Sequence, residues 1–127
     1  MKAGFKKGEK LKSSQLIDLL FTQGKRLSVY PILLTYLQTE HPSDYRIQAG
    51  FSVPKKRFKK AVDRNRIKRQ LREAYRLEKN NLQIINKEGD TKKYILMFVY
   101  ISNEKLDYTV LSESMQKILN KFQAVIK

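Results

Sequence analysis

A concentrated run of positive charge in the middle of the chain constrains the fold more than any other feature. Eleven of the 22 residues from Lys55 to Arg76 are lysine or arginine, and only Asp63 and Glu73 oppose them. The 127-residue chain has a formal net charge of +15, and this segment, with an excess of nine, holds well over half of it. Self-repulsion of this size disfavours a compact state. The sequence therefore predicts a polyanionic partner whose phosphates neutralise the segment.

The same segment carries a clear helical pattern. Four apolar residues recur at i, i+4, i+7 and i+8, which predicts a helix over residues 61–79 with one face in the core. They are Ile67, Leu71, Ala74 and Tyr75. At about 100° per residue, a set of polar residues falls on the other arc of the helix. That set is Asn65, Lys68, Arg69, Arg72 and Arg76.

The residue types on this polar arc suit RNA. Arginine can grip two phosphate oxygens with its planar fork, lysine acts as a mobile point charge, and Asn65 can serve a base edge or a 2′-hydroxyl. A merely solvated helix, with Glu73 paired to Arg69 and Arg76, is the plain alternative. Two acids cannot neutralise eleven cations, however. A membrane-surface helix is also disfavoured, because it needs large apolar residues on a face that here fits a core.

Three elements precede the cationic helix in the predicted order. A helix over residues 13–23 has Ser13 or Ser14 as its N-cap and Gly24 as its stop. Alternating apolar residues then indicate two antiparallel strands, near 32–37 and 47–53.

Two more elements follow the cationic helix. Residues 94–101 are apolar at every position, as expected of a strand inside a sheet, and an apolar stripe from Leu111 to Ile126 predicts a C-terminal helix. The polar connection over 80–93 is interrupted by Leu82, Ile84 and Ile85. We expect one α+β domain over residues 1–127, with element order α-β-β-α-β-α.

Few residues could carry out chemistry or tie the chain to a membrane. The sequence has no cysteine, which removes disulfides and thiolate metal sites. The only histidine, His41, lies in a polar loop and is expected to be solvent-exposed, without a second histidine for acid–base catalysis. Asp63 and Glu73 are roughly 15 Å apart along the predicted helix, too far to share a metal pair. With no secretory signal and no run long enough to span a bilayer, we expect a cytoplasmic protein.

Two motifs flank the start of the cationic helix. The first is Gly50-Phe51-Ser52-Val53-Pro54-Lys55-Lys56-Arg57, and the second is Ala61-Val62-Asp63-Arg64-Asn65-Arg66-Ile67-Lys68-Arg69-Gln70-Leu71-Arg72-Glu73. A strand that ends in Ser-Val-x-Lys-Lys, followed by an Arg-Asn-Arg-x-Lys-Arg-x-x-Arg helix, is similar to the signature of the bacterial ribonuclease P protein subunit. The chain resembles that family closely over residues 50–75 and more loosely in its other elements.

The resemblance implies a small α/β sandwich with a left-handed βαβ crossover, an exception to the usual right-handed rule. It also implies that the second motif faces the catalytic RNA through Arg64, Asn65, Arg66, Lys68, Arg69 and Arg72. By their charge, Lys55, Lys56, Arg57, Lys59 and Lys60 extend this RNA-binding surface.

The family also holds the single-stranded 5′ leader of precursor tRNA in a cleft between the first helix and the sheet. By resemblance, Ile17 and Phe21 occupy the helix side of this cleft, and Tyr36 or Thr35 the strand side. An aliphatic residue at position 17 cannot stack on a base as an aromatic ring would, whereas Phe21 can. Core packing is the plain alternative for these apolar side chains.

By resemblance, the chemistry belongs to the RNA subunit and its Mg²⁺ ions, so we expect no catalytic residue, metal site or cofactor among the protein's side chains. The expected partners are ribonuclease P RNA and precursor tRNA, with no membrane and no obligate protein partner. Two other classes share the size and charge. A ribosomal protein or general RNA chaperone would show no preference for a leader, and a DNA-reading transcription factor would place the basic helix in a major groove.

Overall fold

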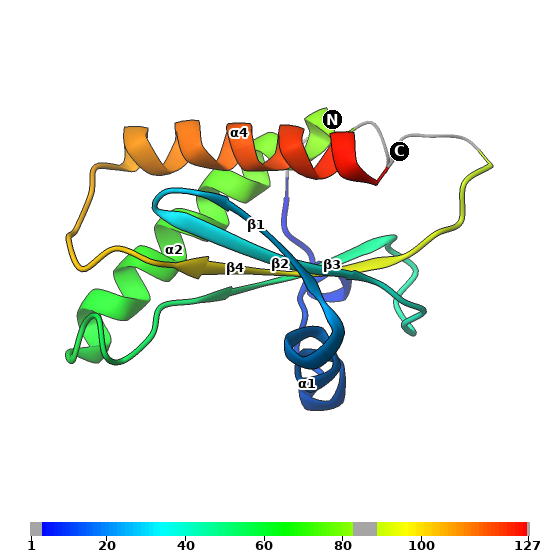
Figure 1. Cartoon of the computed structure of the whole chain (residues 1–127), viewed down its shortest axis with the longest axis horizontal. Helices are drawn as coiled ribbons and strands as arrows, with labels where there is room; N and C mark the ends of the chain where they lie inside the picture. Colours follow the sequence, from blue (N-terminus) through cyan, green and yellow to red (C-terminus); the bar gives the residue numbers. More distant parts are fainter. Residues whose placement is uncertain (1–3, 83–88, 127) are drawn as a thin grey trace.

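The computed structural model describes residues 4–82 and 89–126, and its centre is a four-stranded mixed sheet with helices on both faces (Figure 1). The strands are β1 (Lys25–Val29), β2 (Ile32–Gln38), β3 (Ile47–Ser52) and β4 (Tyr94–Tyr100). The helices are α1 (Ser14–Gln23), α2 (Ala61–Glu78) and α4 (Tyr108–Val125), with short 3₁₀ turns η1 (Lys7–Glu9) and η2 (Lys79–Asn81). α1 covers one face of the sheet, and α2 and α4 cover the other.

The strand order, β1-β2-β4-β3, differs from the expected topology in two ways. The predicted element order lacks β1, which forms a hairpin with β2. β2 and β3, predicted to be antiparallel, run in opposite directions but do not pair, because β4 lies between them, antiparallel to β2 and parallel to β3. β3, α2 and β4 thus form a parallel crossover unit. The left-handedness of that crossover stays a prediction.

β4 is one of the two inner strands, beside β2, as its unbroken apolar sequence predicts. Its side chains alternate between two separate cores. Phe98 and its even-numbered neighbours join the large core beneath α2 and α4. Ile95 and Met97 join a smaller core with Leu11 and Leu20, on the α1 side. Burial on both faces explains why the strand carries no polar alternation.

α1 begins and ends where the sequence indicates. The Ser13 hydroxyl accepts a hydrogen bond from the Leu16 amide at 3.2 Å, which caps the helix. The Gly24 amide donates to the Leu20 carbonyl at 2.7 Å, and β1 starts at the next residue. At Gly24 the backbone passes so close to Leu20 and Thr35 that a side chain would have no room.

The loop between β2 and β3 contradicts one expectation. His41 is buried, not solvent-exposed, and its Nε2 lies 3.3 Å from the Arg46 carbonyl oxygen. The Lys93 ammonium donates to the carbonyls of His41 and Ser43 and thereby folds the loop inward. Burial lowers the pKa of the His41 imidazole, because the charged form loses hydration.

The C-terminal helix matches its predicted apolar stripe, and five of its six stripe residues are buried. They are Leu111, Met115, Ile118, Leu119 and Phe122. In the connection before β4, Leu82 is buried, while Ile84 and Ile85 lie outside the described residues. Across residues 4–82 and 89–126, no helix is long and apolar enough to cross a membrane.

Gly24→Ala should destabilise the fold, because its new methyl group would meet the Leu20 carbonyl and lie 2.9 Å from Thr35 Cγ2. We expect a loss of about 1–3 kcal/mol in the free energy of unfolding, measured by urea denaturation. Gly4→Ala is the matched control, since its nearest contact is an ordinary 3.9 Å to Lys6. Equal stability of the two variants would show that the junction between α1 and β1 can accommodate a methyl group.

Candidate nucleic-acid interface

Eight polar side chains of the predicted RNA-binding set are exposed on the loop 54–60 and the outward face of α2. They are Lys55, Lys56, Lys59, Lys60, Asn65, Arg66, Arg69 and Arg72. We refer to these eight residues as the basic surface. Arg57, Arg64 and Lys68, the other predicted members, are partly buried. The structure thus brings all eleven predicted residues onto one loop and the helix that follows it.

α2 is held in one rotational setting by its apolar face. Ile67, Leu71, Ala74 and Tyr75 are buried, as their spacing predicts. The Tyr75 ring packs among aromatic side chains of the sheet, 5.3 Å from the ring of Phe98 and 5.8 Å from that of Phe51, centroid to centroid. Burial raises the pKa of the Tyr75 phenol, with a further contribution from Glu9. Because this face is fixed in the core, the residues on the other face must point outward.

The far end of α2 is tied down by the N-terminal segment. The Lys79 ammonium pairs with the Glu9 carboxylate in a largely buried ion pair, and it also lies 5.8 Å from the centroid of the Phe5 ring. The Glu9 carboxylate accepts a second hydrogen bond, from the Lys6 amide at 2.7 Å. Leaving either charge of a buried pair without its partner is costly, so the contact fixes where α2 ends.

The cationic loop before α2 is ordered by its own arginines. The Arg64 guanidinium reaches back from the first turn of α2 and donates to the carbonyls of Phe58 and Lys59, each at 2.8 Å. Arg57 donates to the Asn103 side chain at 3.1 Å, and the buried Phe58 ring packs near Tyr100. Arg57 and Arg64 therefore position the loop, while the four lysines around them face solvent.

The two acids within the cationic segment are both engaged by cations. Asp63 pairs with Lys105, from the loop that leads into α4, at 2.9 Å. Glu73 accepts from Arg76 at 2.9 Å, and this hydrogen bond lowers the pKa of the Glu73 carboxyl. The pairing of Glu73 with Arg76 is part of the solvated-helix alternative, but it lies beside the basic surface and neutralises none of its residues.

The chain positions this charge next to a helix N-terminus. α2 begins at Ala61, and its N-cap residue Lys60 provides no side-chain cap, so the backbone amides of the first turn add positive potential to that of the nearby lysines. Lysines near a helix N-terminus are electrostatically unfavourable, because the helix end is itself positive. A bound anion would offset this repulsion. The arrangement can therefore bind a phosphate chain along the loop and the first turns of α2.

The predicted leader cleft is only partly assembled. Phe21 on α1 is 45% exposed, so its ring can reach a ligand. Ile17 is half-buried and packs against the core formed by Leu11, Leu20, Ile95 and Met97, which favours the packing alternative for this residue.

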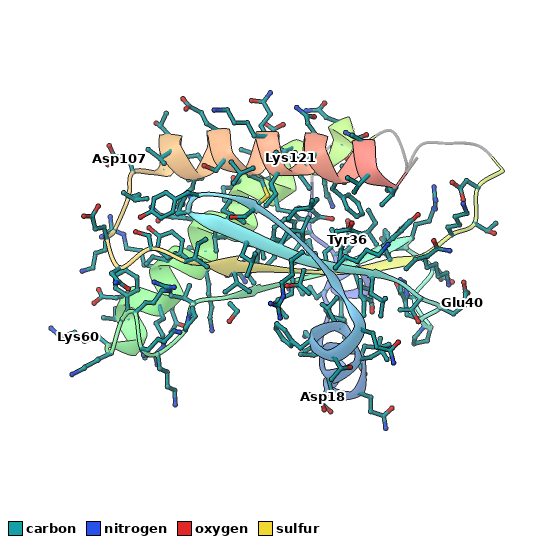
Figure 2. The ribbon with its side chains drawn as sticks, viewed as in Figure 1. Asp18, Tyr36, Glu40, Lys60, Asp107 and Lys121 are labelled. Atoms are coloured by element: carbon teal, nitrogen blue, oxygen red, sulfur yellow. The ribbon has the colours of Figure 1, made fainter. Side chains whose placement is uncertain are left out.

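Tyr36 was assigned to the wrong face of the sheet. Its ring lies 5.3 Å from the Phe122 ring of α4, centroid to centroid, and so on the opposite side from α1. Figure 2 shows Tyr36 between the sheet and α4, with Asp18 of α1 across the sheet. Side chains alternate along a strand, so Leu33, Thr35 and Leu37 of β2 lie on the α1 side, and Thr35, the alternative to Tyr36, is on the predicted face.

Two residues that hold the interface in place have no clear signal in the sequence. Asn103 and Lys105 lie in the loop between β4 and α4, and they contact Arg57 and Asp63 from a distance of more than forty residues along the chain. Within the described ranges, no group of three His, Asp or Glu side chains is placed to hold a metal ion.

Comparison with known proteins gives a consistent answer. Residues 5–123 match the family model described as Ribonuclease P. The ribonuclease P protein component of Porphyromonas gingivalis is 40% identical over 117 residues, which cover 91% of this chain and 84% of that protein.

Two solved structures share the fold. One is a mutant of the Staphylococcus aureus RNase P protein, with a TM-score of 0.72 and 17% identity over 92% of this chain and 90% of that one. The other is the RNase P protein of Thermotoga maritima, with a TM-score of 0.69 and 21% identity over 89% and 96%.

The two arginines at either side of Asn65 should behave differently when replaced. Arg64→Ala removes two hydrogen bonds to loop carbonyls, so we expect it to lower the free energy of unfolding by about 1–3 kcal/mol. Arg66→Ala, on the exposed face, should change it by less than about 0.5 kcal/mol. Denaturant titration of both variants checks this, and an Arg64→Ala protein as stable as wild type would mean that the loop is ordered without Arg64.

Proposed function

Because this chain belongs to the ribonuclease P protein family and is a protein component of that endoribonuclease complex, we propose that its basic surface binds the catalytic RNA. We further propose that the α1 side of the sheet holds the 5′ leader of precursor tRNA, so that the protein assists removal of the leader. The ribosomal-protein and chaperone alternatives are not favoured, because the family model and the relatives are ribonuclease P proteins.

The observation that carries the proposal is the division of α2 into a fixed apolar face and an exposed cationic face. All eight residues of the basic surface are exposed, and the two acids nearby are engaged elsewhere. A surface of this charge binds RNA phosphates by releasing their condensed counterions, so the affinity should fall steeply with salt.

The chemistry of cleavage belongs, in this proposal, to the RNA and to Mg²⁺ ions that the RNA holds. The state of the protein's own titratable groups supports this assignment. His41 is buried in the loop between β2 and β3, while Asp63 and Glu73 are engaged in ion pairs. The protein contributes positive charge, which screens RNA phosphates and lowers the Mg²⁺ concentration that the folded RNA requires.

The leader would contact the exposed ring of Phe21. A single-stranded base can stack on this ring, whereas Ile17 is largely committed to the small core. On the strand side, Leu37 and Val99 are half-buried residues of the α1 face and would line the cleft in place of Tyr36. Thr35, the other predicted strand residue, lies on that face but is buried.

The protein should stimulate cleavage of precursor tRNA by a bacterial ribonuclease P RNA at low Mg²⁺. Arg66→Ala combined with Arg69→Ala should lose most of this stimulation, because both arginines are proposed to contact RNA phosphates. Each lost contact should also reduce the slope of log affinity against log salt concentration by about 0.7–0.9. Initial cleavage rates over a range of Mg²⁺ and salt concentrations provide the measurement.

The matched control removes the same charge from another surface. Lys117 and Lys121 are exposed on α4, where Figure 2 shows Lys121 on the side of the sheet away from α1. Replacing both with alanine should leave stimulation intact. If wild-type protein gives no stimulation, the proposed function is wrong; if both double variants lose it equally, net charge rather than the basic surface is responsible.

A further inference from the structure

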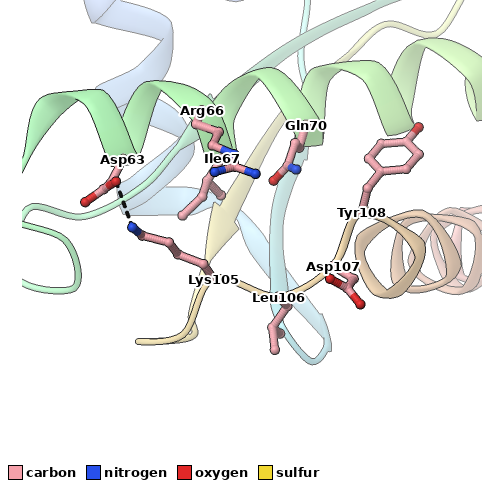
Figure 3. Close-up of a pocket in the computed structure, with 8 residues that line it drawn as sticks. All are labelled: Asp63, Arg66, Ile67, Gln70, Lys105, Leu106, Asp107 and Tyr108. Carbon is pink, nitrogen blue, oxygen red and sulfur yellow. Dashed lines mark ion pairs between the residues drawn. The ribbon is translucent and has the colours of Figure 1, made fainter.

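A polar pocket lies between α2 and the start of α4, at the border of the basic surface (Figure 3). It has a volume of about 220 Å³. Its polar lining consists of Asp63, Arg66, Gln70, Lys105, Asp107 and Tyr108. Arg66 belongs to both the pocket and the basic surface, so an RNA strand bound along the basic surface would pass the mouth of the pocket.

The pocket differs from its surroundings in charge. Its two cations, Arg66 and Lys105, are matched by the carboxylates of Asp63 and Asp107, so its formal charge is zero on a protein of +15. A phosphate group would favour the open lysines of the loop 54–60 over a site that holds two carboxylates. A neutral group with hydrogen-bond donors fits the pocket better.

Asp107 lines the pocket from an exposed position at its edge, where its carboxylate can accept hydrogen bonds from a ligand. Asp107 is the N-cap residue of α4, a position where an aspartate side chain normally accepts from the helix backbone. Here the side chain makes no such bond. In contrast, Asp63 already accepts from Lys105, as the dashed line in Figure 3 shows.

The remaining lining suits a flat heteroaromatic ring. Leu106 supplies apolar surface, and the Tyr108 ring stands beside Gln70 (Figure 3), while Ile67 is almost fully buried beneath them. The Gln70 amide offers both a donor and an acceptor. Burial raises the pKa of the Tyr108 phenol, so the ring stays neutral near neutral pH.

From this combination we propose that the pocket receives one unstacked nucleobase of the RNA bound to the basic surface, and that it selects a base with an exocyclic amino group. Ionised carboxylates only accept hydrogen bonds, so they favour adenine, cytosine and guanine, whose exocyclic amino groups each offer two N–H donors, over uracil, whose base edge offers only its N3–H. The inference rests on the proposed RNA binding and adds to it a second, base-selective contact.

Nucleosides test the pocket without the phosphate that would bind any cation. The full chain is titrated with adenosine, cytidine or uridine, with ribose as the control, and backbone and side-chain amide shifts are followed by NMR. Adenosine and cytidine should shift the signals of Gln70, Leu106 and Tyr108 and bind about tenfold more tightly than uridine, the effect of one hydrogen bond to a charged group. Equal affinity for uridine, equal shifts with ribose, or no shift at millimolar adenosine would overturn the proposal.

Asp107→Asn separates base selection from a structural role. Asparagine is as good an N-cap as aspartate, so α4 should keep its start. The new amide can donate to uracil oxygens, and the preference of adenosine over uridine should fall to near unity. Glu113→Gln, at an exposed position of α4, removes the same charge and should keep the preference. An unchanged preference in Asp107→Asn would contradict the assigned role.

A third measurement identifies the source of the base. If the bound RNA inserts a base, saturating ribonuclease P RNA should displace adenosine from the pocket, and adenosine that stays bound would refute the RNA assignment. Failure here is distinct from failure of the proposed function. A protein that stimulates precursor cleavage but shows no base preference would lose only this inference.

Discussion

The packing of α2 on the sheet is the contact on which the rest of the structure depends. The Tyr75 ring inserts among Phe51 and Phe98, and Leu71 and Ala74 are fully buried beneath the same helix. Burying a large apolar side chain such as that of Leu71 contributes about 1.5–3 kcal/mol. The helix therefore has one strongly preferred rotation about its axis. That rotation alone decides which residues face outward, and it places the arginines of α2 in solvent.

The positive charge that results destabilises the free protein through electrostatic repulsion, but it would favour a complex with RNA. Cations of one sign crowded on a loop and a helix repel each other, and the nearby helix N-terminus adds to that repulsion. The fold tolerates this because Arg57 and Arg64 form hydrogen bonds with loop oxygens and because Lys105 and Asn103 hold the segment from across the chain. RNA phosphates would relieve the repulsion, which links the stability of the surface to the presence of its partner.

The sequence predicts the elements whose side chains are buried in a regular period. α2, α4 and β4 each carry a long apolar pattern, and the structure confirms all three. β1 escapes such reasoning because it is a short edge strand with the sequence Lys-Arg-Leu-Ser-Val, and only Leu27 and Val29 are partly buried. The position of β4 between β2 and β3 also has no local signal, because it depends on pairing between distant segments.

In the candidate site too, residues that follow a regular period are predictable, and those that depend on distant segments are not. The polar residues on the outward face of α2 are predictable because the helical period assigns them to one face. Tyr36 was misassigned although the alternation of β2 already groups it with Ile32 and Leu34, both in the core beneath α4. His41 was misassigned because nothing in a polar loop sequence reveals that Lys93 will draw the loop inward. Likewise, the pocket beside Arg66 depends on a loop that approaches α2 from more than thirty residues away.

If RNA binds the loop 54–60 and the outward face of α2, it should shield the lysines there from chemical modification. Free protein and its complex with ribonuclease P RNA are briefly acetylated, and the modification of each lysine is quantified by mass spectrometry. We expect strong protection of Lys55, Lys56, Lys59 and Lys60, with Lys117 on α4 as reactive as in the free protein. Protection of Lys117 with the loop lysines still reactive would contradict this placement of the RNA.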